Sequence, residues 1–106
     1  MASEAFSRVV IDRKLREAGW NPEDEGQVVF EDHGNVGRAD YVLKDRHGKP
    51  VAIIEAKRPD IDPYSAKDQA SNYVKAQYPD VDYIYLANDH VIYFWDLVQG
   101  DAISVP

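Results

Sequence analysis

The chain has 106 residues, of which 44% are hydrophobic and 11% aromatic, and its formal net charge is −7 at pH 7. This length supports a single domain over residues 1–106, and this composition excludes a disordered chain. Cysteine is absent, which excludes disulfides and thiolate metal sites. The acidic balance weighs against nucleic-acid binding by the isolated domain, because non-specific affinity for phosphates comes mainly from lysine and arginine.

The sequence contains no segment typical of membrane proteins. No apolar run approaches the roughly 20 residues needed to span a bilayer. The first six residues lack a basic stretch leading into an apolar one, so we see no signal peptide. We therefore expect no membrane association and a cytoplasmic location.

A first helix is predicted over residues 4–18, where apolar residues recur at helical spacing. Ser3 is its expected N-cap, and Gly19 follows its expected end. Glu4 and Arg8 extend the apolar face toward the N-terminus. Two interpretations are open: an ordinary i,i+4 ion pair, or a helix face that brings Glu4 to the edge of an active site.

A second helix is predicted from Ser65 to about Gln77, ending before Pro79. Ser65 is its expected N-cap, and Asp68 stands three residues later in a capping-box position.

Several short runs rich in β-branched and aromatic residues are separated by turn residues, as in β-strands. The resulting order is α-β-β-β-α-β-β, which predicts an α/β fold with a mixed central sheet flanked by helices. A helix followed by a hairpin argues against a purely parallel, doubly wound sheet. The predicted strands are residues 27–31, 38–44, 49–57, 81–87 and 91–97, with a short edge strand or a frayed tail at 102–105.

Three charged residues interrupt two of the apolar strands. Asp40 lies in the second predicted strand, and Glu55 and Lys57 lie at the end of the third. Charged groups in such places cost several kcal/mol unless they are paired or hold a metal, so their presence indicates a function. Two carboxylates and one ammonium suit Mg²⁺-assisted attack on a phosphodiester. The alternative is a salt bridge between Asp40 and Lys57 at a sheet edge.

The length of the turn around residues 45–48 decides whether the two acids meet, because successive strand residues face opposite sides. An even-length loop places Asp40 and Glu55 on one face. A two-residue loop sets them directly opposite, with Cβ atoms roughly 5 Å apart, and a four-residue loop sets them one diagonal away, at roughly 7–8 Å. An odd-length loop would put them on opposite faces.

Gln69 and Tyr73 form an i,i+4 pair on the second helix, which is also compatible with a solvated glutamine beside a core-edge tyrosine. Together with Asp40 and the Glu55–Lys57 segment, however, they resemble the D…ExK…QxxxY signature of the PD-(D/E)XK nuclease superfamily. More specifically, the chain resembles the N-terminal nuclease domain of the restriction (R) subunit of type I restriction enzymes. Ala39 departs from the proline of the superfamily name.

The resemblance covers nearly the whole chain, with flanking likeness in residues 4–20, 37–43 and 84–96. It implies a restriction-endonuclease-like core and a Mg²⁺-dependent DNA endonuclease with little sequence specificity of its own. The R subunits of this family also carry an ATP-driven motor. The sequence has no GxxxxGK[ST] phosphate loop, so the single nuclease-like domain contains no motor or helicase domain.

The resemblance also implies roles for individual residues. Asp40 and Glu55 would ligate Mg²⁺, or Mn²⁺ as a substitute, together with the carbonyl of Ala56. Glu4 would bind the metal through water. We expect Lys57 to stabilise charge and position water rather than act as a general base, because two neighbouring carboxylates favour its protonated form.

Gln69 and Tyr73 are expected to position nucleic acid or water. The expected partners are DNA and the motor domain or the specificity and methylation subunits of a restriction complex. One alternative function, favoured by the acidic charge, is a catalytically inactive module with this fold that serves docking or nucleic-acid binding. Another is a general interaction domain whose acids form surface salt bridges. The candidate phosphate contacts are Arg38, Lys44, Arg58 and Lys67.

Overall fold

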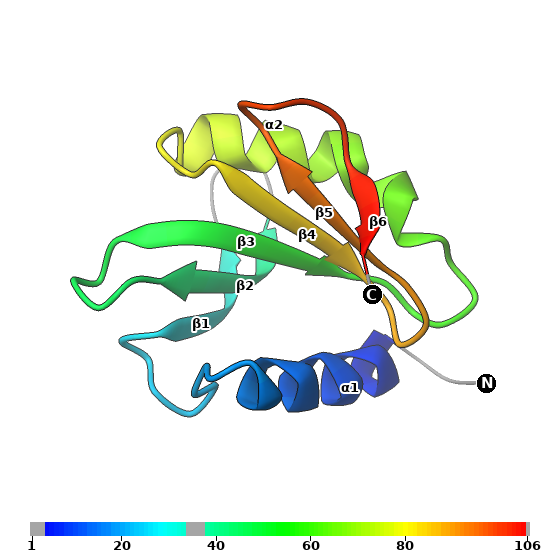
Figure 1. The fold of residues 1–106 in the computed structure, drawn as a ribbon, viewed down its shortest axis with the longest axis horizontal. Helices are drawn as coiled ribbons and strands as arrows, with labels where there is room; N and C mark the ends of the chain where they lie inside the picture. The colour runs from blue at the N-terminus through cyan, green and yellow to red at the C-terminus, as the bar shows by residue number, and fades with distance from the viewer. Residues whose placement is uncertain (1–3, 34–37, 106) are drawn as a thin grey trace.

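Six strands form one sheet in the order in which they occur along the chain, and a helix lies on each side of it (Figure 1). The computed structural model describes residues 4–33 and 38–105. β3 and β4 pair parallel, whereas the other neighbouring strands pair antiparallel. The elements are α1 (Glu4–Glu17), β1 (Val28–His33), β2 (Arg38–Lys44), β3 (Pro50–Ala56), the 3₁₀ turn η1 (Pro63–Ala66), α2 (Lys67–Gln77), β4 (Tyr83–Ala87), β5 (Ile92–Asp96) and β6 (Ile103–Val105).

Each face of the sheet has its own buried cluster. Ile11 and Leu15 of α1 pack with residues of β2 and β3 on one side. Ala70, Tyr73 and Val74 of α2 pack with residues of β2, β3 and β4 on the other. The predicted α/β architecture with a mixed sheet flanked by helices is confirmed, and residues 103–105 form an edge strand. In the described ranges neither helix has the length and apolar character required to cross a bilayer.

The first helix ends where the sequence predicts, with a glycine cap. Gly19 has a φ of +99°, a conformation that costs glycine little. The N–H of Trp20 donates to the carbonyl of Leu15 at 2.9 Å, and that of Gly19 to Arg16 at 3.1 Å, the pair of bonds typical of this cap. The predicted N-cap of the first helix, Ser3, lies outside the described residues.

The predicted start of the second helix is wrong. α2 begins at Lys67 after Ala66, and no side chain caps it. The chain instead enters through η1, whose N-cap is Asp62: its carboxylate accepts the N–H of Tyr64 at 3.0 Å. Pro63 explains the difference, because its fixed φ begins the helical turn two residues before Ser65.

The turn between β2 and β3 contains three residues, 46–48, and is therefore odd in length. The N–H of Asp45 donates to the carbonyl of Lys49 at 2.8 Å, and the N–H of Gly48 donates back to Asp45 at 2.9 Å. Gly48 has a φ of +78°, which a residue with a Cβ adopts only with strain.

A β-bulge corrects this odd length. Lys44 pairs with Pro50, yet Leu43 pairs with Ala52, so Val51 is an extra residue on β3. One extra residue moves every following side chain to the other face of the strand. The turn is thus of the odd length that by itself would separate the two acids, but the odd turn and the bulge together restore the register that an even loop would give.

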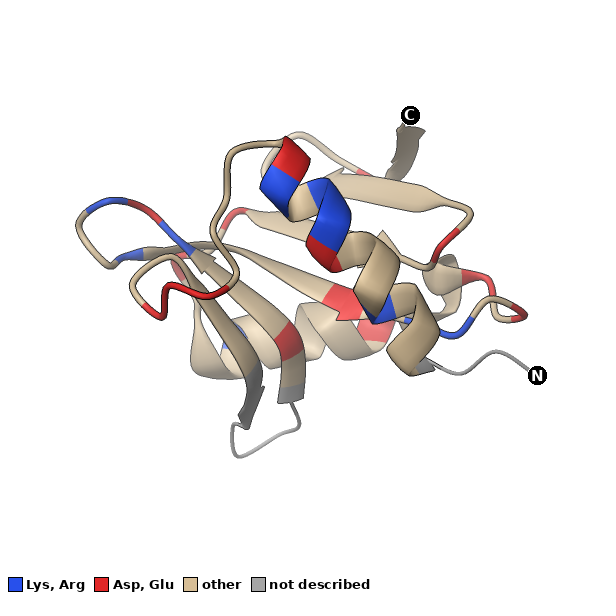
Figure 2. Ribbon diagram, turned by 90° about the horizontal axis from the view of Figure 1, so that it is seen from below, with Lys and Arg blue, Asp and Glu red and all other residues tan. Residues whose placement is uncertain are grey.

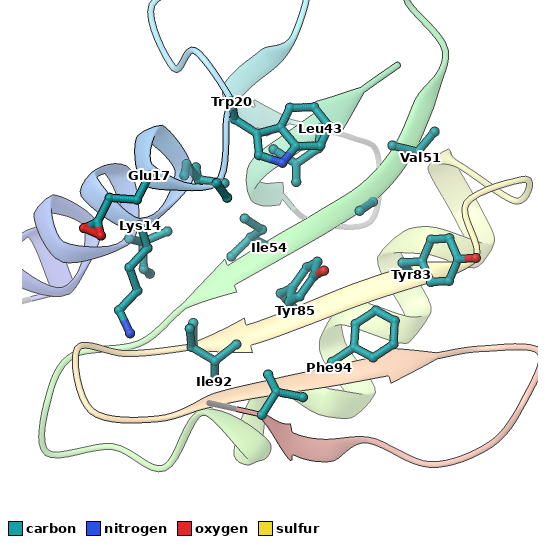
Figure 3. Close-up of a pocket in the computed structure, with 16 residues that line it drawn as sticks. Lys14, Glu17, Trp20, Leu43, Val51, Ile54, Tyr83, Tyr85, Ile92 and Phe94 are labelled. Carbon is teal, nitrogen blue, oxygen red and sulfur yellow. The ribbon is translucent and has the colours of Figure 1, made fainter. Parts of the chain in front are cut away.

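α1 leaves part of its side of the sheet uncovered. An apolar groove of about 1010 Å³ lies between α1 and strands β3 to β5 (Figure 3). Tyr83, Tyr85 and Phe94 lie along it, and Lys14 and Glu17 of α1 stand at its edge. The rings of Tyr85 and Phe94 are 5.3 Å apart, so the aromatic residues of β4 and β5 pack on one another.

The Asp45 carboxylate gives the hairpin turn a pH dependence. It accepts the N–H groups of His47 at 2.8 Å and Lys49 at 3.0 Å, and the bond from Lys49 is the main cause of its lowered pKa. A lowered carboxyl pKa stabilises the fold above the unfolded-state value of about 4, and this stability is lost as the pH falls through the folded-state value. We expect Asp45→Asn to lower the Tm at pH 7 and the difference from wild type to shrink toward pH 2.

Differential scanning calorimetry at several pH values measures this, with Asp80→Asn in an exposed turn as the control for removing one charge. A difference that stays constant or grows on acidification would contradict the assignment.

Candidate active site

The register of the hairpin brings Asp40 and Glu55 together. Tyr41 pairs with Ile54, so the next position along β2 sets Asp40 opposite Glu55. Both side chains are buried, with 2% and 4% of their surface exposed. They lie on the α2 side of the sheet, the side of Val42, two residues after Asp40, and of Ile53, two residues before Glu55.

The carboxylate of Asp40 is fixed by the backbone of β3. Its Oδ2 accepts the N–H of Ala56 at 2.8 Å, in the buried part of the molecule. The last backbone pair of β2 and β3 at this end is Tyr41 with Ile54. Beyond it, the side chain of Asp40 continues the contact between the two strands. In an extended strand the carbonyl of a residue points to the same side as its N–H. The Ala56 carbonyl is therefore directed toward β2 as well.

Lys57 follows directly after β3 and remains attached to the sheet. Its N–H donates to the carbonyl of Ala87 at 2.8 Å, and its side chain is half-buried. Strand alternation places this side chain on the face of Glu55. Two acids and one lysine thus emerge where β2 begins and β3 ends.

The N-terminal half of α1 reaches the same place, although the sequence did not predict the contact between Arg8 and Asp40. Nη2 of Arg8 lies 3.4 Å from the carbonyl oxygen of Asp40, and the guanidinium lies 5.5 Å from the ring centre of Tyr41. The Tyr41 hydroxyl lies 3.1 Å from the Arg8 carbonyl and 2.7 Å from Oδ1 of Asp12. Burial raises the pKa of Tyr41, and the hydrogen bond to Asp12 raises it further.

The signal for this contact was the position of Arg8, one turn before the apolar stripe and therefore on the inward side of the helix. The side chain of Glu4, one turn earlier, lies outside the described part of the structure.

Gln69 and Tyr73 of α2 differ in exposure. Tyr73 is buried, with 2% of its surface exposed, and packs in the cluster that contains Val42 and Ile53. Its ring lies 5.9 Å from that of Tyr78. Gln69 is exposed. This difference matches the alternative interpretation of a core tyrosine and a solvated glutamine, although Tyr73 shares the side of the sheet on which both acids lie.

Two candidate phosphate contacts already interact with acids. Nε of Arg58 lies 3.0 Å from Oδ1 of Asp60. Lys67 forms an ion pair with Asp101, and the hydrogen bond in this pair is the main cause of the raised pKa of Lys67. Its ammonium also lies 4.9 Å from the ring centre of Trp95. The side chain of Arg38 lies outside the described residues.

The donor set fits a magnesium ion. Mg²⁺ commonly uses one or two carboxylates and completes its octahedron with water and substrate phosphate. Asp40 and Glu55 supply two carboxylates, and the Ala56 carbonyl is directed to the same side. In residues 4–33 and 38–105 no group of three or more His, Asp or Glu side chains is arranged to hold a metal. A third carboxylate is not required for this ion.

Solved structures with a similar fold are restriction enzymes. A fragment described as an HsdR subunit of a type I restriction enzyme from Vibrio vulnificus YJ016 has a TM-score of 0.73 and 29% identity, and the match covers 99% of this chain and 23% of that one. The type IIG restriction endonuclease BpuSI has a TM-score of 0.54 and 23% identity, over 88% of this chain and 11% of that one, which shows the fold alone. The protein is thus an α/β domain with the restriction-endonuclease fold.

Sequence comparison identifies the family. Residues 25–102 match the family described as the type I restriction enzyme R protein N terminus. The type I restriction enzyme EcoKI endonuclease subunit of Escherichia coli (strain K12) is 33% identical, over 69% of this chain and 8% of that subunit. The chain belongs to the family of type I restriction enzyme R protein N-terminal domains. It spans less than a tenth of the length of this curated relative.

The bond between Asp40 and Ala56 predicts a graded effect on stability. Asp40→Ala leaves the buried Ala56 N–H without this acceptor and is expected to lower the free energy of unfolding by about 1–3 kcal/mol. Asp40→Asn keeps an acceptor oxygen and should cost less. Urea denaturation of the three proteins measures both values. Equal losses for the two variants would contradict a structural role for the bond.

Proposed function

We propose that this domain is a Mg²⁺-dependent DNA endonuclease that acts within a type I restriction R subunit and has little sequence preference of its own. One observation carries the proposal: two buried carboxylates lie opposite each other at the ends of adjacent strands, with Lys57 two residues beyond Glu55. Two like charges in a buried place repel each other, and a divalent cation between them offsets that cost.

Asp40 and Glu55 would hold the ion directly, with the Ala56 carbonyl as a further ligand and Glu4 acting through water. The hydrogen bond from the Ala56 N–H to Oδ2 orients the Asp40 carboxylate. When bound, Mg²⁺ supplies polarisation of the scissile phosphate and lowers the pKa of a coordinated water.

Lys57 would stabilise the charge that develops on the phosphate and would hold the attacking water. A positive ammonium beside two carboxylates suits electrostatic stabilisation better than proton abstraction. Gln69, on the exposed surface of α2, would contact the nucleic acid, whereas the burial of Tyr73 suits support of the site from beneath.

Delivery of DNA would depend on other parts of a restriction complex. The net charge of −7 opposes binding by the domain alone. The helix α1 carries four basic and three acidic residues among its 14, so its net charge is only slightly positive, and both colours appear on it in Figure 2. Arg8 of this helix reaches the backbone of Asp40. We infer that a motor domain, or the specificity and methylation subunits, holds the DNA against the site.

A second candidate function is a catalytically silent module with the same fold. The acidic charge favours it, as do the ion pairs that already engage Arg58 and Lys67. The two functions differ in whether the isolated domain binds a divalent metal at Asp40 and Glu55.

Nicking of supercoiled plasmid tests catalysis. At high protein concentration with Mg²⁺ we expect nicking that EDTA abolishes, and a loss of at least about 100-fold in Glu55→Gln and Lys57→Ala, because each removes charge at the reacting phosphate. Lys75→Ala, on the exposed side of α2, is the matched control and should retain the wild-type rate. Nicking that survives both site substitutions would refute the proposed centre.

Titration calorimetry with Mg²⁺ and Mn²⁺ tests the metal site without DNA. Wild type should bind one ion, and Asp40→Asn should weaken binding by at least about tenfold, because a carboxylate ligand is lost. Affinity should fall as the pH drops toward the carboxylate pKa values, since protons compete for the ligands. Metal binding without nicking would support delivery of DNA by another domain, and absence of metal binding would favour the silent module.

A further inference from the structure

The turn between β4 and β5 lies beside the loop that follows Lys57 (Figure 1). Asn88 occupies this turn and is buried, with 4% of its surface exposed. A buried amide in a turn is costly unless its donors and acceptor are satisfied. Its hydrogen bonds therefore show what the turn holds in place.

The side chain of Asn88 bridges two segments that are distant in sequence. Its Nδ2 donates to the carbonyl of Ile61 at 2.9 Å and lies 3.4 Å from that of Pro59. Its Oδ1 accepts the N–H groups of His90 at 2.8 Å and Val91 at 2.9 Å. One half of the amide thus fixes its own turn, and the other half fixes the loop after β3.

Lys57 lies between this anchor and the sheet. Its own N–H is bonded to Ala87, the residue before Asn88. Two and four residues further on, the carbonyl groups of Pro59 and Ile61 meet the Asn88 side chain. Pro59 has no backbone N–H, so this part of the loop interacts with the Asn88 amide through its carbonyl groups. The β4–β5 turn therefore holds the backbone on both sides of the Lys57 side chain.

We propose that Asn88 is a positioning residue that fixes the Lys57 ammonium relative to Asp40 and Glu55. This role rests on the proposed nuclease function. An amide is required, because the loop presents carbonyl oxygens while the turn presents N–H groups. Aspartate has nearly the same shape but no donor, and it would set a negative oxygen against the two carbonyls. Asn88→Asp therefore releases the loop and leaves the turn capped.

The test uses the full chain, plasmid DNA and Mg²⁺. Asn88→Asp is expected to lower kcat for nicking by about 10- to 100-fold, because small misplacements of a catalytic group have effects of this size. KM for DNA and the calorimetric affinity for Mg²⁺ should stay at wild-type values, since both acids lie outside the released loop. His90→Ala, an exposed neighbour in the same turn, is the control and should change nothing. If Asn88→Asp does not fold, Asn88→Ser, which keeps a small hydrogen-bonding group, takes its place.

A double-mutant cycle separates positioning from general destabilisation. The rate of single-turnover nicking is measured at high protein concentration. Adding Asn88→Asp to Lys57→Ala should lower this rate by less than about twofold, because the lysine through which Asn88 acts is already absent. An equal loss in both backgrounds, or a loss of Mg²⁺ affinity, overturns the positioning role and leaves the nuclease function standing. A wild-type protein that shows neither nicking nor metal binding overturns both.

Discussion

The hydrogen bond from the Ala56 N–H to the Asp40 carboxylate is the contact on which the site depends. It joins the first residues of β2 to the last residues of β3 at 2.8 Å, just past their last backbone pair. It extends the contact between the two strands to the place where the charged residues emerge. The Asp40 side chain serves here as part of the sheet, so this hydrogen bond offsets part of the cost of burying a carboxylate.

The strands and the faces on which their side chains lie could largely be predicted, because successive residues of a strand face opposite sides of the sheet. Apolar runs separated by turn residues predicted the strands. Within one strand, whether a residue number is odd or even decides the face on which its side chain lies. Glycine after an amphipathic run located the end of α1. Alternation also showed that the shared face of Asp40 and Glu55 depends on the length of the hairpin turn, which the sequence left open.

Other features could not be predicted, because they depend on contacts between distant segments or on competing local signals. Ser65 and Asp68 form a sound capping pattern, but Pro63 and Asp62 begin the turn earlier. The length of the turn at residues 45–48 stayed open, and the bulge at Val51 that offsets its odd length has no distinctive sequence signal. Arg8 reaches Asp40 across 32 positions, and no local pattern specifies its partner. The Asn88 side chain was visible only as a turn residue, because the carbonyl groups it binds lie in another loop.

The three-residue turn and the bulge at Val51 compensate for each other, and this limits how the hairpin can change. A single insertion or deletion between Lys44 and Ala52 would rotate Glu55 into the opposite layer of the molecule, even though the turn is exposed and far from the site. Two compensating length changes would leave the carboxylates where they are. Related domains that conserve the chemistry should therefore differ in hairpin length by even numbers of residues, or should gain and lose the bulge together with a turn residue.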